Sequence, residues 1–147
     1  MKTIKGEKGQ SLVEMALSLV LILILLVGTV EMGMAFFQYI QLRDAAQEGA
    51  LYGSIAPLDS AGIENRVRYS SNSPINLQID TGPSAVNVVI EYVGSGICEG
   101  TGNAIKVTVM YKHKIFMPFM SKILGRSNSL IPLKASVTDT ILSPACP

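Results

Sequence analysis

The sequence predicts an α+β fold, in which a long N-terminal helix, transmembrane in its first half and amphipathic in its second, packs on a small antiparallel β-sheet. Three observations lead to this prediction. An apolar run extends from residue 12 to residue 37, helical spacing of small and apolar residues continues to residue 56, and short alternating segments fill the second half of the chain. The 147 residues therefore accommodate one anchor and one modest domain.

The segment 12–37 is long enough to cross a lipid bilayer. Its only charged residues are Glu14 and Glu31, and about 20 apolar helical residues span a hydrocarbon core of about 30 Å. Three lysines precede the run, and the positive-inside rule places such an N-terminus in the cytoplasm. We therefore expect a single-pass protein of the inner (cytoplasmic) membrane with its C-terminal domain outside. A secretory signal peptide would need a shorter run that ends at a small-residue cleavage site.

The two carboxylates in this run are unusual, because an ionised group at bilayer depth costs roughly 2.5 to 3.5 kcal/mol. Glu31 lies near the outer boundary, where snorkelling or a polar partner would relieve that cost. It is therefore either an interfacial residue or a contact in assembly. Glu14 lies five residues after Gly9, at the inner edge of the run, where leucine would cost nothing. We expect a specific partner to compensate its charge.

The segment from Lys8 to Glu14, KGQSLVE, followed directly by the apolar run, resembles the processing site of type IV prepilins. The resemblance implies that a membrane-bound prepilin peptidase cuts between Gly9 and Gln10, often with methylation of the new amine of Gln10. Glu14 would then be the fifth mature residue. Its carboxylate would be neutralised by the N-terminal amine of an adjacent subunit, which would favour one register between packed helices.

Further along, the chain resembles the TadE-like proteins of tight-adherence pilus systems. The C-terminal third is similar in its two expected strands, 107–111 and 133–141, and in the apolar loop 116–124 between them. The helix carries the rest of the resemblance, in the residues Val30, Glu31, Met32, Gly33, Met34, Ala35, Phe36, Phe37, Leu42, Ala45, Ala46, Glu48, Gly49, Ala50 and Tyr52.

This resemblance implies a pilin-like structural subunit that acts in adhesion or surface attachment and is not an enzyme. Its implied partners are the prepilin peptidase, other pilin subunits and the inner-membrane assembly platform with its cytoplasmic ATPase, and it needs no cofactor. After assembly the subunit would lie in an extracellular pilus. The rival interpretation is an anchored extracytoplasmic binding or sensor domain whose leader is never removed, and a membrane-tethered hydrolase is a distant third.

After the membrane run, small and apolar residues recur at intervals of three and four from Leu42 to Ala56, which predicts one continuous helix that ends at Pro57. This stripe packs either on the sheet of the same chain or on another subunit. The expected organisation is a leader at 1–9, the transmembrane half of the helix at 10–37, its extracytoplasmic half at 38–57 and a globular β-sheet domain at 58–147.

In the globular part, residues 63–69 are expected to form a short second helix. Four segments alternate between apolar and polar residues and predict strands of an antiparallel meander with one buried face. They are residues 75–80, 85–93, 105–112 and 133–141.

Cys98 and Cys146 are the only cysteines, and the expected location outside the cytoplasm permits their oxidation. A disulfide between them would close a loop of roughly 50 residues and stabilise the domain by about 3 to 4 kcal/mol in the chain-entropy model. Two free or separately partnered thiols are the alternative.

Other chemistry has little support in the sequence. The single histidine, His113, stands between Lys112 and Lys114 and is interpreted as a solvated strand residue, so we expect no metal site. Serines are plentiful, but a nucleophile needs a base and an orienting group within reach. With 12 basic and 11 acidic residues, the chain has no basic field suited to nucleic acid.

The expected loop after the third strand is more hydrophobic than a connector needs to be. It contains Phe116 and Phe119 among the residues FMPFM, with further apolar residues beyond. Such a segment either folds back over the core or contacts a neighbouring subunit or the membrane surface.

Overall fold

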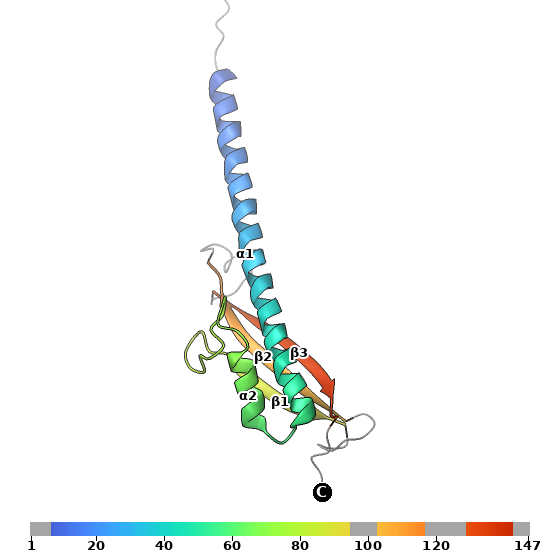
Figure 1. Ribbon diagram of the computed structural model, residues 1–147. Coiled ribbons are helices and arrows are strands. Elements are labelled where there is room, and N and C mark those ends of the chain that lie inside the picture. Colours follow the sequence, from blue (N-terminus) through green and yellow to red (C-terminus); the bar gives the residue numbers. More distant parts are fainter. Residues whose placement is uncertain (1–6, 95–102, 117–128, 143–147) are drawn as a thin grey trace, which may run out of the picture.

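The computed structural model describes residues 7–94, 103–116 and 129–142. In chain order the elements are helix α1 (Glu7–Ile55), helix α2 (Ser60–Tyr69) and strands β1 (Asn87–Val93), β2 (Ala104–Lys114) and β3 (Leu130–Thr140). Helix α1 is one continuous rod, and its first half projects away from a small head in which α2 and the sheet pack on its second half (Figure 1). This arrangement confirms the predicted α+β class.

The first half of α1 is bare. From Gly9 to Val30 no residue is buried within the chain, and one 18-residue window in this helix has a mean hydropathy of 2.6. By length and composition α1 could cross a membrane. From Gly9 onward, the first buried residue of α1 is Glu31, so the head begins to cover the helix at that level.

The second half of α1 carries the stripe that the spacing predicts. Its most buried members are fully enclosed by the head: Leu42, Ala45, Ala46 and Ala50. The stripe therefore packs on the sheet and on α2 of the same chain. Gly49 and Gly53 permit the closest approach, since a β-carbon on Gly49 would meet a methyl group of Val67 at 2.5 Å.

Helix α1 ends at Ile55, just before Pro57, and a short turn leads to α2. Asp59 caps α2 by accepting a hydrogen bond of 2.9 Å from the amide of Gly62. The second helix predicted at 63–69 is confirmed, with a start three residues earlier.

The sheet has the strand order β1-β2-β3, and both pairs are antiparallel. Val107 in the central strand pairs with Ile90 on one side and with Val137 on the other. The face that carries Ile105, Val107 and Val109 lies on α1 and is fully buried. Three of the four predicted strands are therefore confirmed as a meander with one buried face.

The strand predicted at residues 75–80 is wrong. This segment is irregular, although Ile75 and Leu77 are buried as their alternation suggested. Its backbone is held by a side chain, because Gln41 of α1 both donates to the carbonyl and accepts from the amide of Ile75, each at 2.8 Å. The alternation thus reflects burial without strand pairing.

Candidate functional site

The expected processing site lies within helix α1. Gly9 and Gln10 are helical and exposed, and a β-carbon on Gly9 would meet nothing within 4 Å. Glycine in a helix interior costs about 1 kcal/mol relative to alanine, so this point of the helix is weak. An open, weakly helical position suits access by a peptidase, but cleavage there stays a prediction.

Glu14 lies exposed on the bare half of α1, one turn beyond Gln10. In the part of the chain that the structure describes, no group forms a hydrogen bond or an ion pair with its carboxylate. The pairing implied by the prepilin resemblance requires a second subunit, so the role of Glu14 stays a prediction as well.

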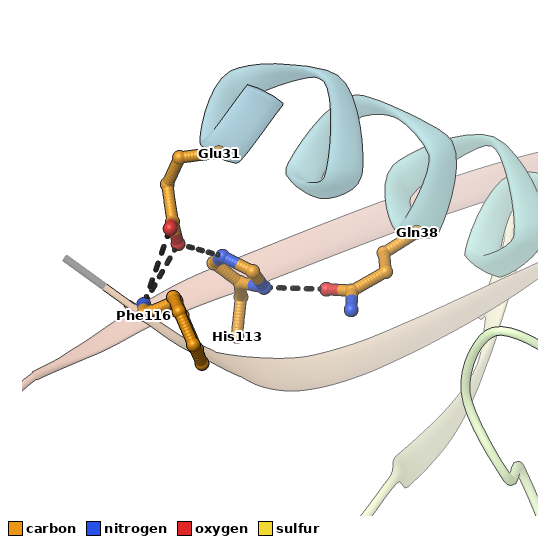
Figure 2. A network of polar contacts seen from close by, with 4 residues as sticks. All are labelled: Glu31, Gln38, His113 and Phe116. Carbon is orange, nitrogen blue, oxygen red and sulfur yellow. Dashed lines mark hydrogen bonds and ion pairs between the residues drawn. The ribbon is translucent and has the colours of Figure 1, made fainter. Parts of the chain in front are cut away.

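Glu31, by contrast, has its partners within the chain, where the bare half of α1 meets the head (Figure 2). Its Oε1 atom lies 2.9 Å from Nε2 of His113, near the end of β2. The backbone amide of Phe116 donates to the same carboxylate, 3.0 Å from Oε1 and 3.2 Å from Oε2. Helix α1 and the end of β2 are therefore tied together by one carboxylate.

His113 is the centre of this network, which corrects the prediction of a solvated side chain. It is only 2% exposed, and its Nδ1 atom lies 2.6 Å from Oε1 of Gln38, which is about two turns beyond Glu31 along α1. A doubly protonated imidazole satisfies both oxygen acceptors, whereas a neutral ring satisfies both contacts if the Gln38 amide is turned to donate. In either state the ring bridges two side chains of α1.

The alternation of apolar and polar residues in β2 indicated that His113 would be buried. His113 has the same parity as Ile105, Val107 and Val109, so its side chain points to the face that lies on α1. The neighbouring Lys112 and Lys114 point to the other face and are exposed. The flanking lysines suggested a solvated residue, but the two-residue period of the strand decides the direction.

Of the two aromatic residues singled out in the apolar loop, Phe116 is described and Phe119 lies outside the described residues. The side chain of Phe116 is 82% exposed, so it does not fold over the core of its own chain. Cys98 and Cys146 also lie outside the described residues, and their pairing stays a prediction. Among the residues the structure does describe, no three His, Cys, Asp or Glu side chains gather as metal ligands would.

A second polar cluster lies at the opposite end of the head. The hydroxyl of Tyr52 donates to Asp59 at 2.8 Å, and the guanidinium carbon of Arg66 lies 5.4 Å from the centre of the Tyr52 ring. The Gly62 amide, followed by the Tyr52 hydroxyl, holds the pKa of Asp59 below its usual value. The same bond to Asp59 raises the pKa of Tyr52. This cluster fastens α2 to the end of α1.

Comparison with known proteins gives one family. Residues 9–51 match the model of the family described as TadE-like protein. The matched segment contains Gly9, Gln10, Glu14, Glu31 and Gln38, and it ends within the part of α1 that the head covers. No curated protein and no solved structure matches the chain.

Proposed function

We propose that this chain, which belongs to the TadE-like protein family, is a pilin-like structural subunit of a tight-adherence pilus. The observation that carries the proposal is the bare apolar half of α1, which lies within the matched segment and continues without a break into the head. Such a helix serves first as a membrane anchor and then as the part by which subunits pack into a filament. No catalytic role is known for this family, and we propose none.

In this proposal residues 1–9 are a leader that a prepilin peptidase removes between Gly9 and Gln10. The N-terminus faces the cytoplasm before cleavage, and the head lies outside, where the lysines before the apolar run favour it. The processed subunit then meets other pilin subunits and the assembly platform, and it ends in an extracellular pilus that acts in attachment.

Glu14 would set the register between neighbouring helices. It lies about 6 Å along the axis from Gln10, since each residue of a helix rises 1.5 Å. A neighbouring helix displaced by roughly that distance would bring its new N-terminal amine opposite the carboxylate. The absence of any partner for Glu14 among the described residues supports this role, because in an apolar surrounding an unpaired carboxylate is costly.

Two measurements test the proposal. Intact-mass analysis of the protein from membranes of its native host should show the loss of Met1 to Gly9, whereas a retained leader would support the rival anchored binding or sensor domain. Glu14→Leu should insert into the membrane normally but be lost from the sheared pilus fraction. Thr29→Leu is a matched control, because Thr29 lies in the same bare half and, within the described residues, its hydroxyl bonds just the carbonyl of Leu25 in its own helix.

Normal incorporation of Glu14→Leu into pili would contradict the role of Glu14 without affecting the anchor. Loss of both variants from the pilus fraction would show a general sensitivity of the bare helix, and the carboxylate would then have no specific role.

A further inference from the structure

One large apolar side chain of the head is exposed at a particular height along α1. Phe116 is 82% exposed, yet its backbone amide is fixed to the Glu31 carboxylate at 3.0 Å. The height of Phe116 is therefore that of Glu31, the residue at which the head begins.

This height coincides with the expected edge of a bilayer. The stretch from Gln10 to Val30 rises about 30 Å, which matches a hydrocarbon core of about 30 Å. Beyond it, α1 still exposes apolar side chains on the faces that the head leaves free, among them Met32 at 76%, Phe36 at 63% and Phe37 at 60%. The exposed apolar residues of α1 thus continue past Glu31, whose level along the helix is also that of Phe116.

We propose that this end of the head sits in the boundary between headgroups and acyl chains of the extracytoplasmic leaflet, with lipid as the partner of the Phe116 side chain. The inference rests on the membrane-anchored stage of the proposed function. Tryptophan and tyrosine are enriched at this depth of a bilayer, and interfacial helices bury phenylalanine together with tryptophan and leucine at the boundary between headgroups and acyl chains. The occupant is lipid because Phe116 lies at the level along α1 where the exposed apolar residues of the bare half continue past Glu31.

The Glu31–His113–Gln38 network fits this position. A carboxylate at the membrane boundary is costly unless protein groups replace its water. Here the His113 ring and the Phe116 amide supply the contacts, and the network is covered to 9% exposure at Glu31 and 2% at His113. The head can therefore enter the boundary layer without carrying an unpaired charge into it.

The charged residues next to His113 also fit a position at the membrane boundary. Lys114 and Lys112 are exposed on the outer face of β2 near its end, where long ammonium side chains can reach lipid phosphates while their stems lie along apolar surface. The described neighbourhood thus combines an aromatic side chain with two cations, which is typical of a membrane interface.

The chain has no tryptophan, so single-tryptophan variants of the full-length protein report depth directly. The test variant is Phe116→Trp, and the control is Leu142→Trp, since Leu142 is 65% exposed and its amide bonds Ser54 at the far end of the head. Glu31 and Ser54 are separated by about 35 Å along α1. Leu21→Trp, in the middle of the bare half, reports anchoring. Each is placed in phosphatidylcholine vesicles with acyl chains brominated near the headgroup or near the chain middle.

We expect the shallow bromines to quench Phe116→Trp several-fold more strongly than Leu142→Trp, and the deep bromines to quench Leu21→Trp most. Iodide in the aqueous phase should give the reverse order. Because Phe116 is exposed, the substitution should leave the far-UV circular dichroism of the head unchanged. Replacing Lys114 with Gln should weaken the response of Phe116→Trp to added anionic lipid.

Quenching of Phe116→Trp no stronger than that of Leu142→Trp would overturn the inference, and the anchor would stand if Leu21→Trp were still quenched. Unquenched Leu21→Trp would instead refute membrane anchoring and with it the proposed function. A blue shift in the tryptophan emission of Phe116→Trp that grows with the protein-to-lipid ratio, without bromine quenching, would instead show that a second copy of the chain covers this position. That result would overturn the proposal that lipid is the partner.

Discussion

Removal of the Glu31 carboxylate should destabilise the head more than any other change of an acidic residue of α1. In Glu31→Ala, the His113 ring loses its contact at 2.9 Å and the Phe116 amide loses its acceptor at 3.0 Å. Hydrogen bonds to charged groups contribute about 1.5 to 3 kcal/mol each, and buried groups left without partners lose their solvation as well. Since the Phe116 amide is only partly buried, we expect a loss of about 3 kcal/mol.

Urea unfolding of the full-length protein in mild detergent, followed by tyrosine fluorescence, measures this loss. A slope of roughly 1 to 3 kcal/mol per molar urea converts it into a midpoint shift of about 1 to 3 M. Glu31→Gln keeps one acceptor oxygen and should lose about half as much. Glu48→Ala is the control, because Glu48 is exposed on the same helix and forms no hydrogen bond or ion pair within the described residues. Its expected effect is below about 0.5 kcal/mol.

Equal midpoints for Glu31→Ala and Glu48→Ala would refute the reasoning, since the carboxylate would then contribute nothing to the fold. A double-mutant cycle with His113→Ala isolates the pair and should give a coupling energy of about 0.5 to 3 kcal/mol. A coupling near zero, with two large single effects, would assign the stability to packing of the ring and not to its contact with Glu31.

Two further changes test the packing of the head in the same urea assay, and a third tests the cap of α2 by thermal unfolding at different pH. Gly49→Ala should lower the free energy of unfolding by about 1 to 2 kcal/mol, because the new β-carbon would overlap a methyl group of Val67. Gly33→Ala is the control: its β-carbon would meet no atom within 4 Å, so the change should be neutral or stabilising by up to about 1 kcal/mol. Equal effects of the two changes would contradict the close approach at Gly49. Gln41→Ala removes two hydrogen bonds to the backbone before β1 and should cost about 2 to 3 kcal/mol; an unchanged midpoint would show that this segment is held by burial alone. Because the pKa of Asp59 is lowered in the fold, its contribution is complete above the pKa of the unfolded chain and is lost as the pH falls through the folded value. Asp59→Asn keeps a capping oxygen, so its unfolding temperature should fall less below pH 4 or so than that of the parent; parallel curves would contradict this.

The periodicity of apolar residues in the sequence was sufficient to predict most of the fold. The apolar run and the stripe from Leu42 onward predicted α1, because a helix in lipid and a helix on a sheet both follow the 3.6-residue period. The alternation in β2 and β3 predicted the sheet. The segment 75–80 is the exception, since alternating burial also arises in irregular backbone when a side chain such as that of Gln41 supplies the hydrogen bonds that a neighbouring strand would otherwise provide.

The network around Glu31 could be predicted only in part. Its position in an apolar run indicated that a polar partner was needed, and the strand period would have turned His113 toward α1. The pairing itself joins residues 82 positions apart in the chain, and no local pattern specifies which of several turns of α1 faces the end of β2. That register is set by packing of the whole head, which a single sequence does not reveal.

Because α1 is one uninterrupted helix, it fixes the rotation of the head relative to the bare half of the helix. Each helical residue turns by about 100°, so Glu14 and Glu31, 17 positions apart, lie about 100° around the axis from each other. The face of α1 that carries Glu14 is therefore at a fixed angle around the helix axis from the face that packs on the sheet. Inserting one residue between Glu14 and Glu31 would rotate the head by about 100° relative to the bare half of α1. A neighbouring subunit packed on the bare half would then face a different side of the head.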